Sequence, residues 1–290
     1  MKDITSSLEK GQKVALVCCS NGLKRNCEEN IRLLCKYLEV QGMDVEISPY
    51  LYADDSVFSG TGKERAKALM DFYAREDIKA IFDVSGGDLA NEILPHLDFS
   101  IIAREQKVFW GYSDLTTVIN AIYAKTGKSS VLYQIRNLVR EQEEEQRRWF
   151  EAALKGENED LFSYRTNFLQ GDVLKGTVVG GNIRCLLKLA GTPYFPDMTG
   201  KVLLLESRSG QVPQMVTYLN QLMQMGVFRK ISGILLGTFT EMEEKVCTPD
   251  IGQLVLHYAG RHIPVAKTEN IGHGADSKAI WIGEQVEIIR

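Results

Sequence analysis

The stretch VFWGYSDLTTVINAIYAKTG (residues 108–127) decides the fold, because a short apolar run changes abruptly into a helical pattern. The apolar run ends at GYSD (111–114), and the segment after it has the apolar spacing of a helix. This pattern predicts a strand, a sharp corner at Ser113, and a helix. A serine at such a corner needs an explanation.

Strand-like and helical segments alternate through the first half of the chain, as they do at residues 107–127. Strands are expected at residues 13–19, 43–52, 79–87 and 107–113, and helices at residues 27–42, 62–77, 89–99 and directly after Ser113. Repeated strand–helix–strand units predict a parallel sheet with helices on both faces. A charged helix at residues 140–157 follows, with Trp149 and Phe150 on its buried side.

The second half is mixed α/β. A loop-rich stretch at residues 158–176 precedes expected strands at 201–206, 232–239, 263–273 and 279–289, and helices at 211–226 and 248–262. We place the domain boundary near residues 160–175. The predicted fold is α/β, with an N-terminal parallel-sheet domain (1–165) and a smaller mixed domain (166–290).

Composition narrows the functional class. The chain has 290 residues, 44% of them hydrophobic and 25% charged, which is ordinary for a soluble globular protein. A formal net charge of -4 without a basic stripe argues against a nucleic-acid partner. The N-terminus lacks the pattern of a signal peptide, and no apolar run is long enough for a membrane span, so we expect a cytoplasmic protein.

Six cysteines show neither a CxxC pair nor ligand spacing with histidine, and no phosphate-binding loop follows the first strand. The sequence therefore predicts no metal and no cofactor. The cysteines are Cys18, Cys19, Cys27, Cys35, Cys185 and Cys247.

Two interpretations of Ser113 are open from the local sequence. As a nucleophile it would be exposed on a tight turn, with the backbone N–H of Asp114 aimed at the oxyanion that its attack creates. Gly111 permits the close approach, although Leu115 stands where GxSxG would place a second glycine. As a structural residue, Ser113 would simply cap the helix.

Paired glycines end the preceding strand, in VSGGD (84–88). Corners at the carboxyl ends of parallel strands face one rim of a sheet, where ligands bind. Gly86 or Gly87 can therefore bring a second N–H to the same oxyanion. A phosphate cradle or a plain turn is the alternative.

A serine nucleophile needs a base, and the base needs an orienting acid. Of four histidines, His273 is the one in a glycine-flanked loop, and we expect it to be the most exposed. Glu206 ends the apolar run LLLE, where a buried carboxylate requires a partner. Ser113, Glu206 and His273 follow the chain order serine, acid, histidine that occurs in other α/β hydrolases.

These residues resemble a known family. GYSD followed by LTT, then GGN-x5-LAGTPYFPD-x3-GKVLLLE, then ENIGHG, together with GGDLANEILPHLDF, is similar to the serine LD-carboxypeptidases (peptidase family S66). The microcin C immunity peptidases are relatives of that family. The resemblance runs from about residue 10 to the C-terminus.

The resemblance implies a nucleophile domain similar to class I glutamine amidotransferases and a smaller C-terminal domain that carries the acid and base. It implies Ser113 as nucleophile, His273 as general base and Glu206 as its orienting partner, with an oxyanion hole from the N–H groups of Gly87 and Asp114. It also implies a cytoplasmic homodimer that removes a terminal D-alanine from a murein tetrapeptide during cell-wall recycling.

The chain departs from the family pattern in two places. VLYQIRN (131–137) replaces a segment that often reads F-[HY]-G-P, and residues 207–209 after Glu206 lack the usual acidic residue. Gly86 and Arg208 are the candidate substrate-binding residues, since a guanidinium pairs well with a carboxylate, although Arg208 as an ordinary surface residue is equally open. These departures concern the substrate rather than the triad.

The sequence therefore leaves two alternative functions open besides that of a carboxypeptidase. One is an immunity-type amidase acting on aminoacyl- or peptidyl-nucleotide conjugates. Such relatives stack the nucleobase on a tryptophan, which is absent here between Phe150 and Gly180, so Tyr164 or Phe168 would have to substitute. The other is a non-catalytic protein of the same fold that binds a small molecule.

Overall fold

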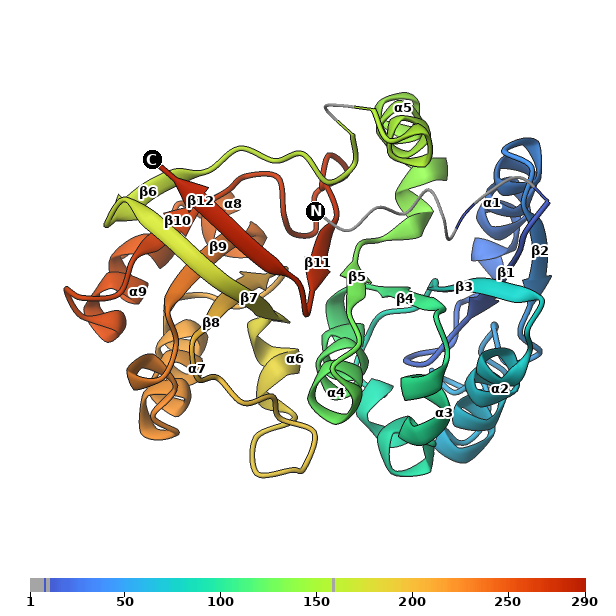
Figure 1. The fold of residues 1–290 in the computed structure, drawn as a ribbon, viewed down its shortest axis with the longest axis horizontal. Coiled ribbons are helices and arrows are strands. Elements are labelled where there is room, and N and C mark those ends of the chain that lie inside the picture. The colour runs from blue at the N-terminus through green and yellow to red at the C-terminus, as the bar shows by residue number, and fades with distance from the viewer. Residues whose placement is uncertain (1–7, 9–10, 158–159) are drawn as a thin grey trace.

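Two six-stranded sheets form the framework of the protein. The computed structural model describes residue 8, residues 11–157 and residues 160–290. In Figure 1 the first sheet and its helices lie on the right and the second sheet on the left, with α4 and α6 packed between them.

The first sheet has the strand order β11-β5-β4-β3-β1-β2. Its first five strands in sequence pair in parallel, and β11, from near the C-terminus, adds antiparallel to β5. The predicted parallel sheet is confirmed. Its strands are β1 (Lys13–Val17), β2 (Asp44–Ile47), β3 (Ile78–Asp83), β4 (Val108–Gly111), β5 (Ser130–Leu132) and β11 (Ile280–Ile282).

Helices cover both faces of this sheet, because its central strands are apolar on both sides. In β1, Val14 and Leu16 pack in one hydrophobic cluster with α1 and α5, and Ala15 and Val17 pack in another with α2, α3 and α4. The helices are α1 (Glu28–Val40), α2 (Gly62–Ala74), α3 (Phe99–Arg104), α4 (Thr116–Thr126) and α5 (Glu143–Lys155), with 3-10 turns η2 (Arg25–Cys27), η3 (Ala90–His96), η4 (Ser113–Leu115) and η5 (Ile135–Val139).

The second sheet is mixed, with the order β12-β7-β8-β9-β10-β6. Strands β7 to β10 run parallel, while β12 and β6 are antiparallel to their neighbours. Its strands are β6 (Asn167–Gln170), β7 (Val173–Asn182), β8 (Lys201–Ser207), β9 (Gly233–Phe239), β10 (Val265–Lys267) and β12 (Gln285–Ile289). Its helices are α6 (Ile183–Leu187), α7 (Val212–Gln224), α8 (Thr240–Glu244) and α9 (Ile251–Ala259), with the 3-10 turn η6 (Val227–Arg229).

Several expectations for the second half of the chain were wrong, among them the strand expected at 263–273, of which only Val265–Lys267 is a strand. Residues 158–176, expected to be loop-rich, contain β6 and the start of β7, and residues 158–159 lie outside the described residues. Strand β6 is a polar edge strand with no fully buried side chain, so it lacks the apolar signal of the inner strands. The single strand expected at 279–289 is two strands, β11 and β12, which separate at Gly283 (φ 93°) and join different sheets.

The strand β11 ties the two halves of the chain together. It lies among residues of the C-terminal half, yet it pairs with β5 through Ile280–Leu132, Trp281–Val131 and Ile282–Ser130. In residues 11–157 and 160–290, no helix is both long and apolar enough to cross a bilayer.

Candidate active site

Ser113 stands at the corner between β4 and α4, as expected. Tyr112 is extended (φ -148°, ψ 177°), and Ser113 turns the chain with a left-handed backbone, at φ 52°. That conformation costs a non-glycine residue roughly 1–2 kcal/mol, and such strain gathers at functional sites. The N-cap positions of η4 and α4 are occupied by Tyr112 and Leu115, so Ser113 is the cap residue of neither helix and the helix-cap interpretation loses its physical basis.

Gly111 explains how the corner tolerates Leu115 at the place of a second glycine. A Cβ atom on Gly111 would lie 2.7 Å from the Leu115 Cβ, and the Leu115 side chain is fully buried over it. The leucine therefore anchors η4 in the core, and the missing side chain at Gly111 supplies the necessary space.

Glu206 and His273 meet as a close pair. Glu206 lies near the end of β8, His273 lies in the loop after β10, and the His273 Nδ1 to Glu206 Oε2 distance is 2.6 Å. The Glu206 carboxylate therefore has the partner that its burial requires. Because a carboxylate accepts hydrogen bonds, the pair places the imidazole proton on Nδ1 and leaves Nε2 as the basic nitrogen.

The expectation that His273 is the most exposed histidine was wrong. Its side chain is only 5% exposed, because the Tyr112 ring packs against it with ring centroids 5.6 Å apart. Gly272 brings the loop against β9, where an added Cβ would collide with the Thr238 hydroxyl, and Thr238 N–H donates to the Ile271 carbonyl at 2.8 Å. The histidine is thus held by tertiary contacts rather than displayed on a surface loop.

Ser113, Glu206 and His273 line one narrow pocket, called here the Ser113 pocket. Within the described residues, His273 Nε2 is buried and has no hydrogen-bond partner. Its residue lines the same pocket as Ser113. The other residues lining it are Tyr112, Leu132, Tyr133, Gln134, Ile271, Gly272, Ser277 and Lys278.

The paired glycines lie beside this pocket, at the end of β3, which neighbours β4. A Cβ on Gly86 would lie 3.2 Å from the Tyr112 hydroxyl, so the glycine corner and the serine corner touch. Gly87 has φ 125°, and its Cβ would lie 2.3 Å from the Asn21 side chain. Asn21 is fixed in turn, since its Oδ1 accepts from the Asp88 N–H at 2.9 Å.

The side chain of Asp114 is a feature that sequence reasoning missed. It is fully buried and accepts hydrogen bonds from Ser20 Oγ (2.6 Å), Ala90 N–H (2.9 Å) and Lys188 Nζ (2.5 Å). Lys188 follows α6, so this ion pair joins the second half of the chain to the residue after Ser113. The one sequence feature that could have indicated this ion pair is the single charge of Lys188 within the apolar run LLKLA (186–190).

We expect Lys188→Met to lower the free energy of unfolding by about 3 kcal/mol, because it leaves a buried carboxylate without its counterion. Urea unfolding monitored by circular dichroism measures the change. Lys67→Met is the matched control, since it breaks an exposed ion pair to Asp71 and should cost less than about 1 kcal/mol. Equal losses in the two variants would show that the Asp114–Lys188 pair has no special role in stability.

Arg208 lies just after β8 and is exposed, and it is not one of the residues that line the Ser113 pocket. Its carbonyl accepts from the Glu241 N–H at 3.0 Å, which fixes the backbone, while the side chain is exposed. The structure thus brings Ser113, Glu206 and His273 into one pocket, sets the paired glycines against Tyr112 beside it, and leaves Arg208 outside its lining.

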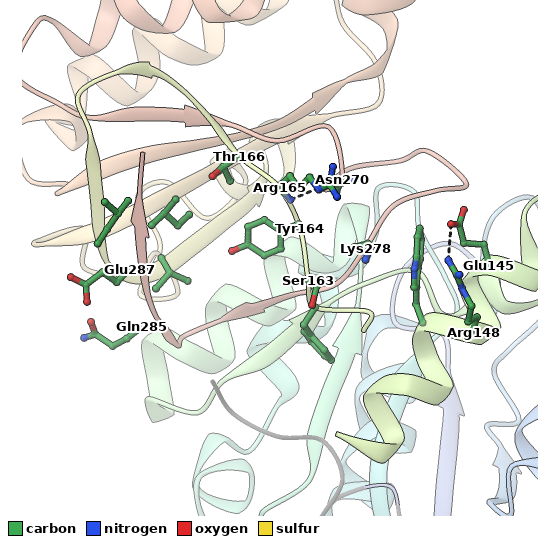
Figure 2. A pocket seen from close by; sticks show the side chains of 15 residues that line it. Glu145, Arg148, Ser163, Tyr164, Arg165, Thr166, Asn270, Lys278, Gln285 and Glu287 are labelled. Carbon is green, nitrogen blue, oxygen red and sulfur yellow. Dashed lines mark hydrogen bonds and ion pairs between the residues drawn. The ribbon is translucent and has the colours of Figure 1, made fainter. Parts of the chain in front are cut away.

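A larger aromatic groove of about 1070 Å³ opens between α5 and β12. Figure 2 shows Tyr164 in its middle, with Gln285 and Glu287 on one side and Glu145 and Arg148 on the other. Trp149 and Phe162 also line it, and Lys278 is shared with the Ser113 pocket. Lys278 Nζ lies 4.1 Å from the centroid of the Trp149 ring. We name this cavity the aromatic groove.

Within residues 11–157 and 160–290, no group of three or more histidine, cysteine, aspartate or glutamate side chains has an arrangement that holds a metal ion. The cysteines in these ranges are free. Burial raises the pKa of the Cys18 thiol to about 12, so this thiol stays protonated at neutral pH.

Comparison with known proteins gives matches over most of the chain. Residues 14–133 match the model of the LD-carboxypeptidase N-terminal domain, and residues 175–288 match that of the LD-carboxypeptidase C-terminal domain. A probable murein peptide carboxypeptidase of Bacillus subtilis is 28% identical over 262 residues, which cover 85% of this chain and 80% of that protein.

Two further matches are an immunity protein and a protein described as similar to it. The microcin C7 self-immunity protein MccF of Escherichia coli is 28% identical over 234 residues, covering 70% of this chain and 68% of that protein. The crystal structure of an MccF-like protein from Bacillus anthracis superposes with a TM-score of 0.85 at 27% identity, covering 97% of this chain and 94% of that one.

Proposed function

The chain belongs to the LD-carboxypeptidase family, and from that premise we propose that it is a serine carboxypeptidase acting through Ser113, His273 and Glu206. One observation carries the proposal. The hydrogen-bonded pair of Glu206 and His273 lies in the same pocket as a serine held in a strained backbone conformation.

In the proposed reaction, His273 Nε2 takes the proton of the Ser113 hydroxyl as the serine oxygen attacks the scissile carbonyl. The carbonyl electrons move to its oxygen, and the N–H groups of Gly87 and Asp114 stabilise that oxyanion. The intermediate then collapses, the C–N bond breaks, and His273 returns the proton to the leaving amine.

Water completes the cycle. His273 removes one proton from the water as its oxygen attacks the serine ester, and the acid product leaves when the proton returns to the Ser113 oxygen. Glu206 holds the imidazole in the orientation that keeps Nε2 basic and stabilises the imidazolium formed in each half-reaction. Every step uses groups of this chain and water.

The proposed substrate is a murein tetrapeptide, from which D-alanine is released. The relative in Bacillus subtilis bears the name of a murein peptide carboxypeptidase, and the narrow Ser113 pocket accords with a small leaving residue. The test is D-alanine release from L-Ala-γ-D-Glu-meso-diaminopimelate-D-Ala by wild type and by Ser113→Ala. We expect release by wild type alone, and no release by either would reject this substrate.

A second candidate is an amidase that cleaves aminoacyl- or peptidyl-nucleotide conjugates. The aromatic groove favours it, because Trp149, Phe162 and Tyr164 present ring surface to a cavity that shares Lys278 with the Ser113 pocket. Trp149 directly precedes residues 150–180, the segment that contains no tryptophan. Cleavage of an aminoacyl sulfamoyl adenosine at a higher kcat/KM than the tetrapeptide would select this function over the first.

We also propose a cytoplasmic homodimer, as the family resemblance implies. Light scattering on the purified protein tests the dimer, which has twice the 32.6 kDa mass of the chain. A single-chain mass at micromolar concentration would reject it.

We expect Gly87→Ala to lower kcat by about 10²- to 10³-fold, because the new Cβ displaces the corner and with it one oxyanion donor. Gly127→Ala is the matched control. Gly127 also has a positive φ, of 68°, but its Cβ would meet no atom within 4 Å, so only stability should fall, by about 1 kcal/mol. Steady-state kinetics beside thermal unfolding separates the two effects, and an unchanged kcat in Gly87→Ala would remove Gly87 from the oxyanion hole.

A further inference from the structure

Arg136 is a buried cation without a counterion. Its residue is only 6% exposed, on η5, and within the described residues it makes no ion pair and no contact with an aromatic ring. Its one side-chain hydrogen bond is long, 3.5 Å from Nε to Gln134 Oε1. A guanidinium carries five donors, so most of its hydrogen-bonding capacity is unused. Holding such a charge mostly buried and without a counterion is costly. Within the described residues its terminal nitrogens are not among the fully buried unpaired atoms, so they reach solvent, where an anion that arrives with a ligand can bind them.

Two more arginines lie beside it. Arg140 and Arg208 are exposed and likewise form no ion pair in the described part of the chain. Packing around the Arg140 guanidinium and the positive charges of Arg136 and Arg208 lower the pKa of Arg140. Arg136 lies in η5, Arg140 caps the end of that turn, and Arg208 directly follows β8, so the chain brings three positive charges to one region. Two acids close to Arg208 in the chain or by contact have other partners, since Glu206 bonds His273 and Glu241 bonds Lys245.

This arginine cluster, defined as Arg136, Arg140 and Arg208, adjoins the Ser113 pocket. Tyr112 lines that pocket, packs its ring on His273 and lies against Gly86. Gln134, the partner of Arg136, lines the pocket itself. Arg136 and Arg208 belong to residues 131–137 and 207–209, the two segments in which this chain departs from the family pattern, and Arg140 follows just after the first of them.

We propose that the arginine cluster binds an oxyanion of the substrate next to the scissile bond, and that in a peptide substrate this group is the terminal carboxylate. The proposal rests on the proposed function. Planar guanidinium groups bind carboxylates with paired hydrogen bonds, and a carboxypeptidase substrate carries its carboxylate one residue from the bond that breaks. In a nucleotide conjugate the sulfamate or phosphate would occupy the same place.

The test measures binding to the full-length Ser113→Ala protein by calorimetry, so that it does not depend on turnover. The ligands are the murein tetrapeptide, the same peptide with a C-terminal amide, and an aminoacyl sulfamoyl adenosine. Arg140→Gln and Arg208→Gln are added singly to Ser113→Ala, with Arg32→Gln as the control, since Arg32 is exposed and pairs with Glu29. Arg136→Met is added last because its burial makes it the variant most prone to misfold.

We expect the tetrapeptide to bind about 10- to 100-fold more tightly than its amide, the range given by charge-assisted hydrogen bonds. Each cluster variant should weaken binding of the tetrapeptide by about tenfold. Binding of the amide to the cluster variants, and of every ligand to the Arg32→Gln control, should change by less than about twofold. The melting temperature of the free protein should not fall in Arg140→Gln or Arg208→Gln, because removing one of three like charges relieves repulsion.

Other outcomes are equally decisive. If the acid and the amide bind alike and no cluster variant weakens any ligand, or if the variants weaken acid and amide equally, the proposal is overturned. If only the conjugate depends on the arginines, the site stands and its anion is the sulfamate. Turnover by wild type is measured separately, so arginine-dependent binding without cleavage rejects the proposed function and leaves the site intact.

Discussion

Ser113→Ala is expected to lower kcat by at least about 10⁴-fold while leaving the free energy of unfolding within about 0.5 kcal/mol of wild type. The rate falls because the substitution removes the attacking oxygen, and binding with the oxyanion donors alone supplies only residual catalysis. Stability is kept because Ser113 is not the N-cap residue of η4 or of α4, positions that Tyr112 and Leu115 occupy. Steady-state kinetics and urea unfolding on one preparation measure both quantities.

Ser113→Gly is the informative companion. Glycine adopts φ 52° without the clash that a Cβ causes, so this variant should be more stable than wild type by about 1 kcal/mol and equally inactive. A cap residue behaves in the opposite way, since replacing it with alanine costs about 1 kcal/mol and leaves turnover intact. That second pattern would contradict the nucleophile assignment.

Glu206→Gln is expected to lower kcat by about 10³- to 10⁴-fold. The amide keeps the volume of the carboxylate but loses its charge, and it can present an N–H to His273 Nδ1, which places the imidazole proton on Nε2. The histidine then no longer accepts the Ser113 proton. The effect should fall on kcat rather than on KM, because Glu206 is buried behind the imidazole and only 1% of its side chain is exposed.

Asp71→Asn is the control for Glu206→Gln, since Asp71 is an exposed partner of Lys67 and its loss should change kcat by less than about twofold. A Glu206→Gln protein that keeps more than about a tenth of wild-type kcat would mean that His273 is oriented by its packing against Tyr112 alone.

The location of the site was predictable because parallel sheets place the ends of neighbouring strands at one rim. The corners at Gly87 and Ser113 follow β3 and β4, which are paired in register from Ala80–Val108 to Phe82–Trp110. The need of a buried Glu206 carboxylate for a partner was equally predictable, since desolvating a lone charge is expensive at any point in the chain.

The surroundings of these residues were not predictable, because they come from segments far apart in the sequence. The burial of His273 depends on Tyr112, and the ion pair of Asp114 depends on Lys188. The local pattern of apolar and polar residues does not encode such long-range contacts. In the sequence, Arg136 is only part of a departure from the family motif. That it is a mostly buried cation without a counterion follows from the residues packed around it.

The strand errors have a related cause. The run at 279–289 alternates well enough to suggest one strand, but the turn at Gly283 sends Trp281 into the first sheet and Val286 into the second. Which sheet a short apolar segment joins is decided by its partner strand, and periodicity does not encode the partner.

The central claim is that Ser113 is a nucleophile activated by His273. The most direct measurement is intact-mass and peptide-level mass spectrometry after treatment with a fluorophosphonate, which forms a stable bond with an activated serine. We predict one adduct, located on Ser113, absent in Ser113→Ala and formed at least about 10²-fold more slowly in His273→Ala. An unlabelled wild-type protein, or an adduct at another residue, would contradict the account and favour a non-catalytic binding protein of the same fold.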